Sequence, residues 1–197
     1  MRRDAKKRRL KIIDAATELF REHSHTVPLE TVAARAGVGI ATLYRNFPDR
    51  TSLLHACGSA VLARAIDLQD DVLAHFDDDP RSQWHRYVTA LVDMGLGAMV
   101  STFAPEDMDR LPADVAALRT RAAELGNEIL SRAHAAGLVA EPITHQRFLA
   151  GLVTVTRPPV VGIRKLEPDT LPWLVGIYVA GLAHGGTPQI PTGGTAG

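Results

Sequence analysis

The segment Gly-Val-Gly-Ile-Ala-Thr-Leu-Tyr-Arg-Asn-Phe at residues 37–47 is the feature that most restricts how this chain can fold. It follows a run from Leu29 to Ala36 in which apolar residues recur at the spacing of one helical face. Gly37 comes where that helix must end, at a position where a left-handed residue is usually glycine. A second short helix begins near Ile40. Two short helices joined by so tight a turn predict a helix-turn-helix.

The second of these helices presents polar side chains on its outer face. Its spacing turns Leu43 and Phe47 inward. The residues left to face outward are Thr42, Tyr44, Arg45 and Asn46. A hydroxyl, a phenol, a guanidinium and an amide can all bond phosphate oxygens or base edges, so this helix predicts contact with double-stranded DNA.

Helices on either side are expected to support this pair, because helices of about two turns are unstable alone. Arg9 to Phe20 reads as an amphipathic helix with one apolar side. After Pro48, Asp49 is a suitable N-cap for a further helix that starts at Arg50.

Three motifs occur in a fixed order along this region: Ile-x-x-Ala-Ala-x-x-Leu-Phe at 12–20, Leu-x-x-Val-Ala-x-x-Ala-Gly-Val at 29–38 and Thr-Leu-Tyr-x-x-Phe at 42–47. Together with the basic Arg50, they resemble the tetracycline-repressor (TetR) family of bacterial transcription regulators. The resemblance covers about residues 9–54. It implies an all-α homodimer whose N-terminal three-helix domain binds a palindromic operator and whose C-terminal domain binds a small ligand and dimerises. The DNA-binding residues expected here are Gly39, Ile40, Thr42, Tyr44, Arg45, Asn46 and Arg50.

The chain departs from the family pattern at three positions. Pro28 stands where a Ser or Thr usually caps the second helix, so one phosphate-facing hydroxyl is missing. Asn46 replaces a usual His, and Arg50 replaces a usual Lys. Both replacements keep hydrogen-bonding capacity, so phosphate contact is expected to change in detail and to persist.

Positive charge is concentrated at the N-terminal end. The whole chain balances 22 Lys and Arg against 22 Asp and Glu, but residues 1–50 hold 11 basic and 6 acidic residues. A surplus of 5 at one end suits a protein that presents one face to phosphates. A solvated basic tail is the alternative interpretation.

The rest of the chain predicts helices only. Pro- and Gly-containing breaks separate helical segments of about 50–76, 81–102, 113–136, 143–156 and 169–184, and sustained strand alternation is missing. The predicted fold is all-α, with a helix-turn-helix domain over 1–48, a ligand-binding and dimerisation domain over 49–184 and a flexible tail over 185–197. The sequence lacks an apolar run of membrane-spanning length and a signal peptide, so a cytoplasmic protein with no membrane partner is expected.

A small-molecule effector site is expected inside the second domain. Residues 84–103 concentrate aromatic and Met side chains, and Gly95 and Gly97 interrupt them, which calls for a kink or a close approach by a ligand or another helix. The resemblance implies that these helices enclose an effector, mostly apolar because few charges face inward; plain core packing is the alternative. The candidate ligand-binding residues are Leu62, Ile66, Trp84, Tyr87, Leu91, Met94, Phe103, Leu118, Ala122 and Leu125.

The last two helices are the expected dimer interface, because they carry more apolar surface than one core requires. Their apolar residues are Phe148, Leu149, Leu152, Val155, Leu171, Leu174, Val175, Tyr178, Val179 and Leu182. A two-fold dimer would match a palindromic site.

Catalysis and cofactor binding have little support in the sequence. The eight His residues are scattered, Cys57 is the only cysteine, and Gly37-Val-Gly39 lacks both a preceding strand and a third glycine. We therefore expect no enzyme activity and no cofactor. Two functions stay open: a ligand-responsive DNA-binding repressor, and a helical ligand- or protein-binding dimer with weak or vestigial DNA binding.

Overall fold

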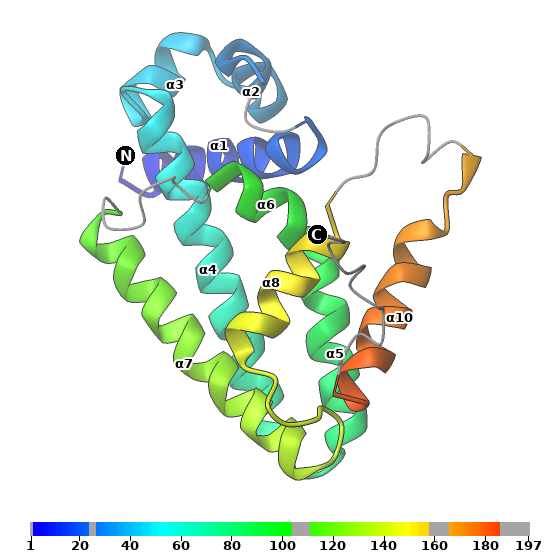
Figure 1. Ribbon diagram of the computed structural model, residues 1–197. Coiled ribbons are helices and arrows are strands. Elements are labelled where there is room, and N and C mark those ends of the chain that lie inside the picture. The colour runs from blue at the N-terminus through cyan, green and yellow to red at the C-terminus, as the bar shows by residue number, and fades with distance from the viewer. Residues whose placement is uncertain (1, 24–26, 104–110, 158–165, 186–197) are drawn as a thin grey trace, which may run out of the picture.

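Every regular element that the computed structural model describes is a helix (Figure 1). The structure describes residues 2–23, 27–103, 111–157 and 166–185. Within these ranges the all-α prediction is confirmed. None of the described helices is both long and apolar enough to cross a membrane.

The first three helices form a small bundle at the N-terminal end. They are α1 (Arg2–His23), α2 (Leu29–Ala36) and α3 (Ile40–Asn46). The turn between α2 and α3 depends on Gly37, whose φ of 66° is left-handed and therefore favours glycine. Behind it, the Val38 N–H donates to the Ala33 carbonyl at 3.0 Å. The helix-turn-helix prediction is thus confirmed with its expected limits.

The interior of this bundle is a separate apolar cluster. Ile12, Phe20 and Leu43 are completely buried in it, and Phe47 is 1% exposed. Helix α1 supplies most of the packing for the two short helices. It begins earlier and ends later than the expected 9–20, since its basic N-terminal residues are good helix formers.

A long helix, α4 (Arg50–His75), connects this bundle to the rest of the molecule. Its first turn is fixed by a capping box, in which the Ser52 N–H donates to Asp49 Oδ1 at 2.7 Å and the Ser52 side chain pairs with the Asp49 backbone. Helix α4 then lies along α7 (Ala113–Ala135) for much of its length (Figure 1). Its two ends therefore belong to different parts of the molecule.

The prediction of a single helix over 81–102 is wrong in one respect, because this segment forms two helices. These are α5 (Pro80–Asp93) and α6 (Leu96–Phe103). Gly95 separates them with a left-handed φ of 73°, and it lies directly against the side chain of Arg21 on α1. The break lets α6 turn away and pack between α1, α4 and α8.

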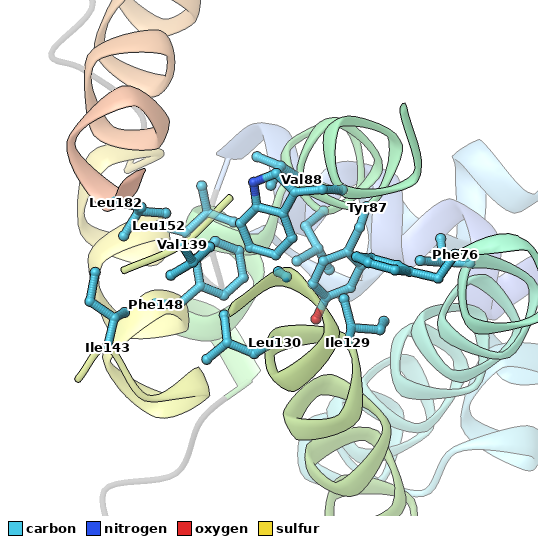
Figure 2. Packing of buried hydrophobic residues seen from close by; sticks show 14 residues of the cluster. Phe76, Tyr87, Val88, Ile129, Leu130, Val139, Ile143, Phe148, Leu152 and Leu182 are labelled. Atoms are coloured by element: carbon cyan, nitrogen blue, oxygen red, sulfur yellow. The ribbon is translucent and has the colours of Figure 1, made fainter. Parts of the chain in front are cut away.

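The main core lies where α4, α5, α7, α8 (His145–Val155) and α10 (Thr170–Ala183) meet (Figure 2). Phe148 on α8 is at its centre, with Trp84 and Tyr87 of α5 against it at ring-centroid distances of 5.1 and 6.1 Å. The expected tail over 185–197 lies outside the described residues, except for Gly185.

Candidate nucleic-acid interface

Helix α3 carries the exposed surface that a DNA groove would meet. Ile40 and Tyr44 are large side chains left 38% and 47% exposed, one helical turn apart. Gly39 caps the helix without a side-chain hydrogen bond, and the space next to its Cα is open. The first residues of α3 can therefore approach another molecule closely.

The other polar residues of α3 are partly engaged within their own helix. Arg45 Nε donates to the Ala41 carbonyl at 3.1 Å, and Asn46 Nδ2 donates to the Thr42 carbonyl at 2.8 Å. Arg45 is exposed and keeps both terminal nitrogens for phosphate, whereas Asn46 and Thr42 are half-buried. The sequence pattern predicted the same outward-facing position for all of these residues, whereas their exposure in the structure differs.

Arg50 has a structural contact that the sequence did not suggest. Its Nη2 donates to the Val27 carbonyl, and its guanidinium lies 5.8 Å from the centroid of the Phe20 ring. These contacts join the start of α4 to α1 and to the residue before Pro28. Substitution of Arg50 would therefore disturb the packing of the bundle as well as any phosphate contact.

Arg9 was predicted only as part of the basic end, and the structure gives it a specific neighbour. Its guanidinium lies 4.4 Å from the centroid of the Phe47 ring, in a cation–π arrangement at the C-terminal end of α3. Lys6, Lys7 and Arg8 precede it on the exposed start of α1. The basic start of α1 thus reaches the end of the candidate recognition helix through Arg9.

We expect Tyr44→Ala to weaken binding to DNA of any sequence by about tenfold or more, because a hydrogen bond to a charged phosphate is lost. Tyr44→Phe should lose most of the same affinity, since the hydroxyl is the donor. Ile40→Ala is the matched control on the same face, and it should change which sequences are preferred. Gel-shift titrations against selected and random DNA measure both effects. Unchanged affinity in both Tyr44 variants would contradict the assignment.

The predicted ligand-binding residues do not share one environment. Trp84, Tyr87 and Leu91 pack in the main core, and Leu125 is also buried. The residues left half-buried are Leu62, Ile66, Leu118 and Ala122 on α4 and α7, and Met94. Met94 lines a hollow between α1, α2, α4 and α5. The side chain of Phe103 lies outside the described residues.

A hydrogen-bonded line of three buried side chains, which the sequence analysis did not predict, runs through the main core. Gln69 Nε2 on α4 donates to the Ala122 carbonyl at 3.0 Å and to the Tyr87 oxygen at 3.2 Å. The Tyr87 oxygen lies 3.1 Å from His145 Nε2 on α8. With Gln69 as its donor, the Tyr87 hydroxyl can give its own proton to His145. The imidazole is then a neutral acceptor.

Burial explains the protonation states along this line. Desolvation lowers the pKa of His145 to about 4, because a charged imidazolium would lose its hydration in the core. Desolvation also raises the pKa of Tyr87 to about 12, partly offset by the hydrogen bond from Gln69. All three side chains are therefore neutral at physiological pH. The side-chain oxygen of Gln69 and Nε1 of Trp84 are buried without a partner among the described residues.

Gly126 on α7 makes room for the imidazole of His145. A Cβ at this position would lie 2.1 Å from His145 Cε1, well inside contact distance. The glycine is thus required by close approach of the ring, and the polar line depends on it.

Two family models match the chain. The model described as bacterial regulatory proteins of the tetR family matches residues 12–57, and that of the transcriptional regulator SbtR-like C-terminal domain matches residues 79–184. An HTH-type transcriptional regulator of Staphylococcus aureus (strain USA300) is 32% identical over 85 residues. That alignment covers 43% of this chain and 44% of the regulator, so the chain spans less than half the length of this curated relative.

Solved structures with the same arrangement cover nearly the whole chain. A TetR transcriptional regulator from Streptomyces coelicolor is 26% identical, with a TM-score of 0.59 over 88% of this chain and 97% of that one. A TetR transcription regulatory protein from Mycobacterium vanbaalenii is 23% identical, with a TM-score of 0.61 over 92% and 98%. A fatty acid degradation regulator from Bacillus halodurans is 19% identical, with a TM-score of 0.60 over 89% and 97%. The last two show a shared fold.

Proposed function

This chain belongs to the TetR family of transcriptional regulators, and on that premise we propose that it is a repressor that binds a palindromic operator as a homodimer and leaves it when a small, mostly apolar ligand binds. Helix-turn-helix regulation of transcription is the function of the family, whose members bind DNA and are not enzymes. The main observation in favour of operator binding is that Ile40 and Tyr44 are exposed on α3, and Arg9 of the basic start of α1 contacts Phe47 at the C-terminal end of the same helix.

Helix α10 supports the homodimer, because it keeps a large apolar surface. Trp173 and Ile177, one turn apart, are 64% and 51% exposed. Gly176 and Gly181 have open space next to their Cα atoms, which allows close approach by another helix. Phe148 and Leu152, which the sequence also offered for dimerisation, are buried in the core of the chain. Trp173 was missed because α10 is apolar on all sides.

We expect Trp173→Glu to weaken dimerisation by about 30-fold or more, since a tryptophan buried at the centre of an interface typically contributes about 2 kcal/mol or more. Leu10→Glu is the matched control, because it places the same charge on a half-exposed apolar residue of α1. Sedimentation equilibrium of both variants and of the wild type measures the effect. A Trp173→Glu protein with the dimer affinity of the wild type would remove α10 from the interface.

The path of α4 supports release by a ligand. This helix begins at Arg50, beside the recognition element, and ends in the main core against α7. An effector between α4, α5 and α7 would tilt it. The two recognition helices must lie about 34 to 36 Å apart to reach successive major grooves, so a small tilt in each subunit would spoil the match. Release requires only that the ligand prefer the tilted state, typically by about 1 to 3 kcal/mol.

Selection of bound fragments from random DNA by the purified protein is the experiment that tests this function. The expected product is a palindromic DNA sequence. Small molecules can then be screened for those that release the protein from it. An authentic effector must bind the operator complex more weakly than it binds the free protein, as calorimetry would show. If selection enriches no sequence even at low salt, the chain is instead a helical ligand- or protein-binding dimer with vestigial DNA binding.

A further inference from the structure

A hollow of about 860 Å³ lies at the junction between the N-terminal bundle and the rest of the chain. Helices α1 and α2 form one wall, and α4 with the C-terminal end of α5 forms the other. We call it the junction hollow. It is separate from the exposed face of α3 and from the polar line in the main core; Met94, one of the predicted ligand-binding residues, lines it, whereas Trp84, Tyr87 and Leu91 do not.

Charged residues dominate the lining of the junction hollow. The basic ones are Lys11, Arg21, Arg35 and Arg64, and the acidic ones are Asp14, Glu18 and Asp93. The lining thus holds one more basic residue than acidic ones, and its positive groups come from both walls. An apolar effector of the kind expected in the main core would remove water from these charged side chains without replacing its hydrogen bonds, which is unfavourable.

The arginines of the junction hollow each engage a neighbour through a single terminal nitrogen. Arg64 Nη2 pairs with Asp14 at 2.8 Å, and Arg35 Nη1 pairs with Glu18 at 2.9 Å. Arg21 Nη1 donates to the Asp93 carbonyl at 3.2 Å. Arg35 and Arg21 therefore keep Nη2 and Nε, which form a planar pair of donors that a carboxylate or phosphate can accept, and Arg64 keeps Nη1 and Nε as separate donors.

The existing ion pairs are of a kind that a ligand can replace. Their side chains are 45% to 60% exposed, and pairs so open to solvent contribute little to stability. An incoming oxyanion held by two arginines gains charge-assisted hydrogen bonds in return. Asp14 and Glu18 also line the hollow, and their carboxylates, about half exposed, stay in contact with water when they are released.

We propose that the junction hollow binds a small organic molecule that bears several oxyanion groups, held by Arg64 on α4 and by Arg35 and Lys11 of the N-terminal bundle. Such a ligand contacts the DNA-binding helices and the body of the chain at the same time. The hollow is large enough for such a ligand, because its volume falls within the range of about 300 to 1,000 Å³ usual for small-molecule sites.

Calorimetric titration of the full chain with citrate, and separately with pyrophosphate, tests this proposal in Tris chloride buffer at constant ionic strength. One saturable site per chain is expected for at least one probe. The tighter probe tells whether the natural ligand carries carboxylates or phosphates. No saturable binding of either probe would overturn the proposal.

Matched arginine variants locate the site. Arg64→Gln and Arg35→Gln should each weaken binding about tenfold or more, whereas Arg121→Gln, which removes a similarly exposed arginine paired with Asp70 elsewhere on the surface, should change it less than about twofold. Equal losses in all three variants would mean non-specific attraction and would overturn the site. Circular dichroism verifies folding, and Lys11→Gln repeats the test if an arginine variant does not fold. The titrations contain no DNA, so their outcome is independent of operator binding.

Discussion

Raising the salt concentration from about 50 to about 200 mM is expected to weaken operator binding by a factor of about 10³ to 10⁵. The reason is that a dimer which places roughly 6 to 10 basic groups on phosphates releases as many condensed counterions. The exposed start of α1, with Lys6, Lys7 and Arg8, supplies such groups in each subunit, and the exposed Arg45 on α3 adds another. Fluorescence anisotropy with a selected operator, titrated at several salt concentrations, gives the slope.

Neutralising single charges separates the contributing residues. Lys7→Gln should make the slope shallower by about 1 for each phosphate contact that is lost. Arg121→Gln, whose side chain pairs with Asp70 on α4 and lies outside the basic end, should leave the slope as it is. A flat salt response in the wild type would mean that the basic end of the chain does not face DNA.

Acidification from pH 7 to about pH 4 is expected to lower the free energy of unfolding by about 3 kcal/mol through His145 alone. In the unfolded chain the imidazole has an ordinary pKa near 6.5, whereas burial lowers the pKa to about 4 in the folded chain. Between these values the unfolded state binds a proton that the folded state does not, so stability falls as the pH falls. Above about pH 6.5 the imidazole is neutral in both states and this dependence ends.

Urea unfolding at a fixed protein concentration, repeated between pH 7.5 and pH 4.5, measures this dependence. His145→Gln is the matched variant, because a neutral amide can still accept the hydrogen bond from Tyr87 and does not titrate. The wild type should lose stability more steeply than the variant below about pH 6.5. Parallel curves for the two proteins would show that His145 is not buried as a neutral group.

The limits of the helix-turn-helix could be predicted because short-range chemistry sets them. Gly37 ends α2 through a left-handed backbone, and Asp49 begins α4 through its side chain. In both cases the residue that marks the helix boundary in the sequence is also the residue that stabilises this boundary in the structure. The true start of α1 was missed for the opposite reason, since Lys6 to Arg8 are exposed helix formers that have no apolar periodicity to mark them.

The break at Gly95 and the polar line depend on residues far apart in the chain. The sequence showed that Gly95 required a reason, but the reason is the side chain of Arg21 beneath it. Gln69, Tyr87 and His145 come from three helices, and no local pattern relates them. Three-dimensional packing decides such features, so the periodicity of apolar residues in the sequence does not reveal them.

The exposed face of α10 could not be predicted from the sequence, for a different reason. Its apolar residues occur on all sides, so the helix has no polar stripe to tell which side meets the core. The structure resolves this by placing Leu182 in the core and Trp173 outside (Figure 2 shows Leu182 beside Leu152). Dimerisation through the last two helices stays a prediction, and Trp173 and Ile177 are the large apolar side chains of α10 that the structure leaves exposed.

The polar line also restricts how this core can change over evolutionary time. Replacing Gln69, Tyr87 or His145 alone with an apolar residue leaves a buried neighbour unpaired, at a cost of about 1 to 3 kcal/mol, whereas exchanging all of them for well-packed apolar residues can be nearly neutral. Gly126 is tied to the same group, because only a glycine tolerates the imidazole beside it. We therefore expect these four positions to change together among related chains, because the intermediates are the least stable members of the series.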